Sequence, residues 1–139
     1  MRMHPYLSFS GNCEAAFKFY EKALNGKIVF LATYGGSPME NQVPPEWKGK
    51  VMHATFTCGD QVLGGADVYG DQYRETHGIA ITLETPDPAE AERVFSEISQ
   101  GATVRMPLQE TFWAHRFGML RDQFGIPWMM NCEKGAAGQ

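Results

Sequence analysis

The stretch PYLSFSGNCEAAFKFY, residues 5–20, joins a strand to a helix and sets the architecture of the chain. Tyr6–Ser10 alternates apolar and polar side chains, which is typical of a half-buried strand. Asn12 is a favoured residue type at a helix N-terminus, and Glu14 places a negative charge in the first turn, where the helix dipole stabilises it. Gly26 predicts the end of the helix. The apolar residues recur at helical spacing, at Ala16, Phe19, Tyr20 and Ala23.

Three further strands are predicted after this helix. Residues 27–34 form the first, and a loop rich in proline and glycine follows between Gly35 and Gly49. Residues 51–58 and 61–68 form the next two, which a tight turn at Gly59-Asp60 joins. The first half of the chain therefore has the order βαβββ.

The same order restarts at His77. HGIAITLE, residues 77–84, is typical of a strand, and Asp87 is predicted to cap a helix that has proline at its first position and a capping-box glutamate. Gly101 predicts the end of that helix. Its buried face is predicted to consist of Ala91, Val94, Phe95 and Ile98. Strands are predicted next at about 102–109, 112–121 and 126–132.

The helices of the two halves align at an offset of about 75 residues, Phe19 with Phe95 and Gly26 with Gly101, which indicates an internal duplication too long in period for a solenoid. The chain is therefore predicted to be an α+β protein of two tandem βαβββ modules, about 4–70 and 76–133. We expect them to form a single domain over residues 1–134. Residues 135–139 are predicted to be a loose tail.

The composition narrows the classes of function. The three cysteines, among 139 residues, are widely spaced and odd in number, so we expect free thiols in a reducing, cytoplasmic protein. The net charge is -4 and the basic residues are scattered singly, so no nucleic-acid partner is expected. No stretch approaches the roughly 20 apolar residues that span a bilayer, so no membrane partner is expected either.

Three stretches carry a family resemblance: residues 5–20 quoted above, QETFWAHRFG at 109–118 and DQFGIPWMMN at 122–131. With the paired modules, they resemble the PhnB-like branch of the vicinal oxygen chelate superfamily, which includes glyoxalase I, extradiol dioxygenases, fosfomycin-resistance proteins and bleomycin-binding proteins. The resemblance implies that each module curls its sheet into half of a cup around a small molecule. Members of this branch often carry a demethylubiquinone methyltransferase label, but the chain has no GxGxxG motif on a strand-to-helix turn to hold a methyl-donor nucleotide.

The resemblance also locates the positions where metal ligands stand in the superfamily. They fall on Pro5, Gly78 and Met129, whose side chains cannot bind a hard or borderline divalent ion. His4 and His77 each stand one residue away, where strand alternation turns them to the opposite face. No firmly bound metal is therefore expected. The alternative is a divalent metal site built from His4, His77 and Asp67, with bulges at the strand starts that swing the two histidines inward.

The ligand-binding residues are predicted from strand alternation combined with the resemblance. In TFWAHRFG, residues 111–118, Trp113, His115 and Phe117 share one face and Arg116 lies on the other. The resemblance implies that this strand borders the cup, so Trp113 is predicted as a flat apolar wall, His115 as a proton carrier and Arg116 as a clamp for an anionic group. The alternative is a Trp113 packed under a helix or at a dimer interface, a His115 bonded to a backbone carbonyl and an Arg116 in solvent.

Leu7 and Phe9 share a face with Pro5 and are predicted to line the inner wall of the cup, which would make that wall largely apolar. An apolar wall favours binding over acid–base chemistry. The leading hypothesis is thus a homodimeric small-molecule-binding protein without a firmly bound metal, whose ligand the sequence does not name. Two alternatives stay open: a metal-dependent lyase, dioxygenase or transferase of the same superfamily, and a structural or regulatory dimer with a vestigial cup. Whether the chain is an enzyme is left open.

Overall fold

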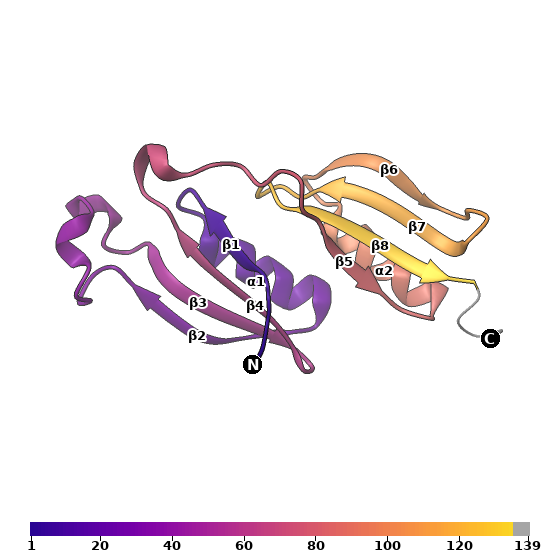
Figure 1. Ribbon diagram of the computed structural model, residues 1–139, viewed down its shortest axis with the longest axis horizontal. Helices are drawn as coiled ribbons and strands as arrows, with labels where there is room; N and C mark the ends of the chain where they lie inside the picture. Colours follow the sequence, from indigo (N-terminus) through magenta and orange to yellow (C-terminus); the bar gives the residue numbers. More distant parts are fainter. Residues whose placement is uncertain (135–139) are drawn as a thin grey trace. The chain divides into compact units, whose positions relative to one another are not determined.

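A computed structural model describes residues 1–134, and the predicted tail 135–139 lies outside the described residues. The chain divides into two compact units, Met1–Glu75 and a second that begins at Thr76. Each unit runs strand, helix and three strands, so the predicted α+β architecture of two βαβββ modules is confirmed (Figure 1). That the two units form one domain stays a prediction.

The first unit contains a four-stranded sheet in the order β1-β4-β3-β2, in which β1 runs parallel to β4 and the other neighbours are antiparallel. Its loop between β2 and β3 carries two short 3-10 helices, and a third 3-10 helix follows β4. The elements are β1 Tyr6–Phe9, α1 Cys13–Leu24, β2 Lys27–Thr33, η1 Glu40–Gln42, η2 Pro45–Trp47, β3 Val51–Cys58, β4 Gln61–Asp67 and η3 Gly70–Gln72.

The second unit repeats this topology with the sheet order β5-β8-β7-β6, in which β5 runs parallel to β8. The predicted cap is confirmed, because the Asp87 carboxylate accepts a hydrogen bond from the Ala89 N–H at 3.0 Å. The first strand is shorter than predicted and begins at Ile81 rather than at His77. The elements are β5 Ile81–Glu84, α2 Pro88–Ile98, β6 Thr103–Gln109, β7 Ala114–Arg121 and β8 Pro127–Glu133.

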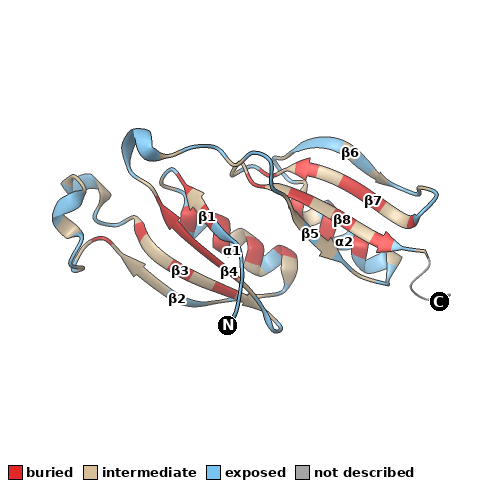
Figure 2. Cartoon of the chain, viewed as in Figure 1, coloured by how far each residue is buried: buried red, intermediate tan, exposed pale blue. Residues whose placement is uncertain are grey.

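The core of each unit lies between the sheet and its one helix. On α1 the buried face includes Phe17, whose ring meets that of Phe56 on β3 at 6.0 Å. Gly65 on the central strand β4 makes room for this ring, since a Cβ there would lie 2.7 Å from Phe17 Cζ. Figure 2 shows the same organisation in both units, with buried bands along the inner strands and on the helix sides that face them.

The two ends of α1 differ from the predictions. Asn12 makes no side-chain capping bond; the carboxylate of Asp67 instead accepts from the Cys13 N–H at 2.9 Å. Asp67 can do so because the parallel register sets it beside Phe9, next to the turn that enters the helix. At the other end Asn25, with φ of 56°, takes the left-handed conformation. Gly26 is needed for a different reason, because a Cβ there would lie only 2.4 Å from the ring of Phe56.

Candidate ligand-binding site

Within residues 1–134, each sheet has one face covered by its α-helix and one face that no α-helix of the same unit covers. In the first unit Phe9 packs edge-on against Phe17 of α1, with ring centroids 6.0 Å apart, and Leu7 on the same face is buried. Leu7 and Phe9 were predicted to line a ligand cavity. They lie on the opposite face of the sheet, where they pack against α1 in the core of the unit. Tyr6 alternates with Leu7 and falls on the helix-free face. We call this face, formed by Tyr6, Phe30, His53 and Gly64, the N-terminal sheet face.

In the second unit the helix side is marked by Gly118 on β7. A Cβ there would lie 2.8 Å from Cε1 of Phe95 on α2, so Gly118 faces the helix. Phe117 consequently points to the helix-free side, as does Asn131, its partner in the antiparallel register with β8. We call this face, formed by Thr82, Phe117, Met119, Met129 and Asn131, the C-terminal sheet face.

Trp113 lies at the end of the C-terminal sheet face. Its ring contacts that of Phe117 at a centroid distance of 5.3 Å and an interplanar angle of 66°. Trp113 is 41% exposed whereas Phe117 is only 9% exposed, so the indole covers the phenyl ring and turns an aromatic surface to solvent. Phe112, almost fully exposed, leans edge-on against the same indole at 4.9 Å. The three rings form an aromatic wall at this end of the sheet.

A β-bulge separates the other two predicted residues from this wall. Ala114 pairs with Glu133 and Arg116 with Cys132, which leaves His115 without a register partner. The Arg116 guanidinium lies on the helix side, where its Nε is 2.8 Å from a carboxylate oxygen of Glu92 on α2. The structure therefore brings Trp113 and Phe117 together, whereas Arg116 is directed to α2. The face on which His115 lies was predicted from strict strand alternation, and the bulge interrupts that alternation.

Asn131 contributes an unpaired acceptor to the C-terminal sheet face. Its Oδ1 is buried and has no hydrogen-bond partner among residues 1–134. Its Nδ2 donates to Oε1 of Glu133 at 3.2 Å, and this bond fixes the amide orientation, since a flipped amide would set oxygen against carboxylate. A buried acceptor without a partner costs free energy unless a donor reaches it. A ligand O–H or N–H group that reached this oxygen would satisfy it.

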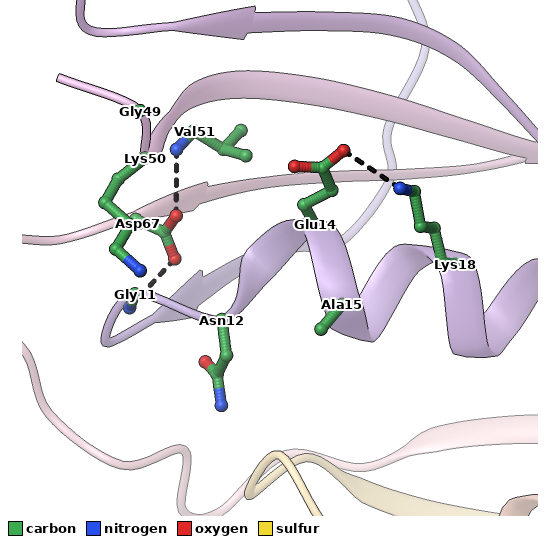
Figure 3. A pocket seen from close by; sticks show the side chains of 9 residues that line it. All are labelled: Gly11, Asn12, Glu14, Ala15, Lys18, Gly49, Lys50, Val51 and Asp67. Atoms are coloured by element: carbon green, nitrogen blue, oxygen red, sulfur yellow. Dashed lines mark hydrogen bonds and ion pairs between the residues drawn. The ribbon is translucent and has the colours of Figure 1, made fainter. Parts of the chain in front are cut away.

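A cavity of about 390 Å³ lies between the start of α1 and the start of β3. Figure 3 shows Asp67 on its wall, held between Gly11 and Val51. One Asp67 oxygen accepts from the N–H groups of Gly11 and Cys13, both at 2.9 Å, and the other accepts from Val51 N–H at 2.8 Å. The second carboxylate of the cavity, Glu14, is paired with Lys18 at 3.2 Å. Both carboxylates are thus already engaged within the protein.

This arrangement does not fit the alternative metal site. Asp67 is 1% exposed, and its carboxylate oxygens accept hydrogen bonds from three backbone N–H groups. His4 is exposed and lies over the N-terminal sheet face, with Nε2 3.7 Å from where a Cβ of Gly64 would stand. The Nδ1 of His77 lies 3.5 Å from the guanidinium of Arg121, whose charge opposes a bound cation. Within the part of the chain that the structure describes, no group of three or more His, Cys, Asp or Glu side chains is arranged to hold a metal ion.

Sequence reasoning missed two features of these faces. Tyr6 and His53 meet on the N-terminal sheet face although they are far apart in sequence, and His53 carried no signal beyond an alternating strand. The unpaired oxygen of Asn131 likewise depends on register and on the neighbouring Glu133. The glycine pair in VLGGAD, residues 62–67, was the one available signal, since adjacent glycines inside a strand point to close approach by other groups.

The known proteins that this chain is similar to include three of nearly the same length. Protein PA1353 from Pseudomonas aeruginosa is 41% identical, with 96% of this chain and 98% of that chain covered and a TM-score of 0.84. The PhnB protein from Bacillus cereus is 26% identical, with coverage of 94% and 98% and a TM-score of 0.81. Protein YjdN of Escherichia coli K12 is 30% identical over 142 residues, covering 96% of this chain and 97% of its own.

More distant structures share the fold alone, among them the fosfomycin resistance protein FosX from Mesorhizobium loti, at 13% identity and a TM-score of 0.64. None of the helices in residues 1–134 has the length and apolar character needed to cross a membrane. Residues 2–130 match the family model for the Glyoxalase/Bleomycin resistance protein/Dioxygenase superfamily. With this match and its PhnB-like relatives, the chain belongs to the Glyoxalase/Bleomycin resistance protein/Dioxygenase superfamily.

Proposed function

We propose that this protein binds a small, partly aromatic molecule on the C-terminal sheet face and does so without a firmly held metal ion. Superfamily members bind small molecules, which supplies the class of function. The observation that carries the location is the buried Oδ1 of Asn131, which lacks a partner within residues 1–134. Phe117 is its direct cross-strand neighbour on the same face.

The chemistry of this face defines the ligand. Trp113 and Phe117 supply a flat apolar wall, and aromatic rings pack on such walls edge-on or offset. Met119 and Met129, paired across β7 and β8, supply a soft apolar floor that adapts to irregular shapes. The unpaired Oδ1 of Asn131 can accept one hydrogen bond from a ligand donor. The expected ligand therefore carries a ring or other apolar body together with an O–H or N–H group.

The proposal of metal-free binding is supported by Asp67. Its carboxylate accepts three backbone hydrogen bonds, which leaves about one lone-pair site, and the side chain is only 1% exposed, so it is poorly placed to coordinate an ion. We also retain His115 as a candidate contact, because it lies beside the aromatic wall in the chain. Arg116, paired with Glu92, is left out of the proposed site.

The test uses two probes with the same ring system, one with a hydrogen-bond donor and one with that donor methylated. 2-Naphthol carries an O–H group and 2-methoxynaphthalene does not. We expect 2-naphthol to bind the wild-type chain more tightly and to raise its unfolding midpoint, since a ligand specific for the folded state stabilises it. Trp113→Ala is expected to weaken 2-naphthol binding by roughly ten-fold. Asn131→Leu, which removes the acceptor and keeps the branching at Cγ, is expected to abolish the preference between the probes.

Trp47→Ala is the matched control, because it deletes an indole from the first unit and leaves the C-terminal sheet face intact. It should bind both probes like the wild type. Equal affinity of the wild-type chain and Trp113→Ala for 2-naphthol would show that the ligand does not use this wall.

We further propose that the chain is a homodimer in a reducing, cytoplasmic compartment. Large apolar side chains such as Ile79, 71% exposed, and Phe112, 90% exposed, are costly on an isolated monomer. All three cysteines are free thiols, and Cys13 and Cys132 are buried. Sedimentation equilibrium should give twice the monomer mass; a monomer at micromolar concentration would contradict the dimer.

A further inference from the structure

Three methionines lie side by side across three neighbouring strands of the second unit. In the sheet order β5-β8-β7-β6, Met129 on β8 pairs with Met119 on β7, and Met119 pairs with Met106 on β6 (Figure 1). Paired residues extend from the same face of a sheet, so the three thioethers form one row on the helix-free side. Each of the three is half-buried, so small solutes can reach the sulfur atoms.

Met129 differs from the other two in its neighbour on β5. Thr82 pairs with Met129 in the parallel register, and the exposed Thr82 hydroxyl donates to Met129 Sδ at 4.0 Å. The contact is long and weak because a thioether sulfur is a poor acceptor. No side chain within residues 1–134 donates to the sulfur of Met106 or Met119. Only one sulfur of the row therefore has a hydroxyl donor beside it.

Oxidation would turn this weak contact into a strong one. The Sδ lone pair attacks one oxygen of a peroxide and the O–O bond breaks, so the sulfur loses two electrons and becomes a sulfoxide. The proton of the transferred oxygen passes to the leaving oxygen, which departs as water. The Thr82 hydroxyl can donate to the leaving oxygen as negative charge develops on it, and afterwards to the sulfoxide oxygen, a strong acceptor. The neighbouring hydroxyl thus favours both the reaction and its product.

The next residue, Met130, is protected from the same reaction. It pairs with Gly118, which faces α2, and it is only 2% exposed. Alternation therefore places Met130 in the core and Met129 on the open face. A sulfoxide at Met129 changes the binding surface and leaves the packing between sheet and helix intact.

We propose that Met129 is a site of reversible oxidation by peroxides, and that its sulfoxide weakens ligand binding on the C-terminal sheet face. The second part of this inference rests on the proposed function. Oxidation places a polar group in the soft apolar floor that Met119 and Met129 form, where the apolar body of a ligand would lie. A methionine sulfoxide reductase restores the thioether with electrons from a thiol, so the change can be reversed.

The oxidation site is tested by treating the full-length folded protein with dilute hydrogen peroxide. Mass spectrometry of its peptides, with fragmentation that separates Met129 from Met130, follows the sulfoxide at each position. We expect Met129 to oxidise several-fold faster than Met119, while Met130 stays a thioether. Thr82→Val removes the hydroxyl and keeps the shape, so it should slow oxidation of Met129 by roughly three-fold or more and leave Met119 unaffected. Equal rates at Met119 and Met129, or an unchanged rate at Met129 in Thr82→Val, would overturn the proposal.

The effect on binding is tested with 2-methoxynaphthalene, which has no donor for a sulfoxide oxygen. Its affinity for the wild type should fall about ten-fold after peroxide treatment, and recover after incubation with a methionine sulfoxide reductase and dithiothreitol. Met129→Leu keeps an apolar side chain that peroxide does not oxidise, so its affinity should be the same before and after treatment.

This variant also controls for oxidation elsewhere, since it retains the exposed methionines of the first unit, Met1, Met3 and Met39. An equal fall in affinity in Met129→Leu would show that Met129 does not control binding. The two proposals fail in different ways. Absence of binding by the untreated wild type would refute the proposed function and the control of affinity, whereas the mass spectra decide the oxidation site by themselves.

Discussion

The strongest structural prediction concerns Asp67, whose carboxylate joins three segments of the first unit. Replacing it by asparagine keeps the shape and removes the charge. The remaining oxygen can still accept from the N–H groups of Gly11 and Cys13, whose nitrogens lie 2.9 Å from Oδ1 in the wild type. The new NH2 group then takes the place of Oδ2 and faces the N–H of Val51. Two donors opposite each other cannot bond, so one buried N–H loses its partner in Asp67→Asn.

The size of the effect follows from these contacts. Hydrogen bonds to a charged group contribute about 1.5–3 kcal/mol, and a buried donor left unpaired costs about 1–3 kcal/mol, so we expect Asp67→Asn to lower the free energy of unfolding by roughly 2–4 kcal/mol. For a chain of 139 residues, each kcal/mol lowers the midpoint by about 3–5 °C. A loss on the order of 10 °C is therefore expected by calorimetry or by circular dichroism.

Asp60→Asn provides the matched control. Asp60 lies in the exposed turn between β3 and β4, and among residues 1–134 it accepts only from the side chain of its neighbour Gln61, so the change should stay within about 0.5 kcal/mol. If Asp67→Asn unfolded within the same margin as Asp60→Asn, the three backbone bonds would not hold the unit together as argued. The case against a metal ligand at this position would then weaken as well.

Two further predictions follow from burial and close packing. Gly26→Ala should lower the free energy of unfolding by about 1–3 kcal/mol, because the added methyl would lie 2.4 Å from Phe56 Cζ. Gly49→Ala is the control and should be neutral, because nothing lies within 4 Å of its added methyl; equal urea midpoints for the two variants would refute this reasoning. Burial, reinforced by the charge of Asp67, raises the pKa of the Cys13 thiol from 9.0 to about 12, so the folded chain keeps a proton that the unfolded chain releases. Stability should therefore fall as the pH rises from about 9 towards about 12, and Cys13→Ala should remove this part of the decline in urea titrations at several pH values; the same slope in both proteins would contradict it.

The local elements of this fold were readable from the sequence because they depend on short-range rules. Asp87 before a proline and an apolar helical face predicted α2, and its cap is in place. The repeat of the whole order about 75 residues later predicted the second unit, since a duplicated pattern forms the same elements twice. The observed ends of most strands and helices lie within a few residues of the predicted ends.

What failed were the inferences that needed a partner from elsewhere in the chain. Asn12 has the right residue type for a cap, but Asp67 takes that role because the parallel register brings it to the turn. The bulge at His115 is likewise invisible to a strict two-residue period.

The sequence by itself determined the superfamily, the two βαβββ modules and the alternation of each strand, because periodicity and turn chemistry are local properties. Only the tertiary structure decided which of the two alternating faces of β1 carries the helix, and so turned Leu7 inward and Tyr6 outward. The pairing of Tyr6 with His53 and the unpaired oxygen of Asn131 arise in the same way. Alternation separates two faces but cannot say which one is buried, since that choice depends on where the helix packs.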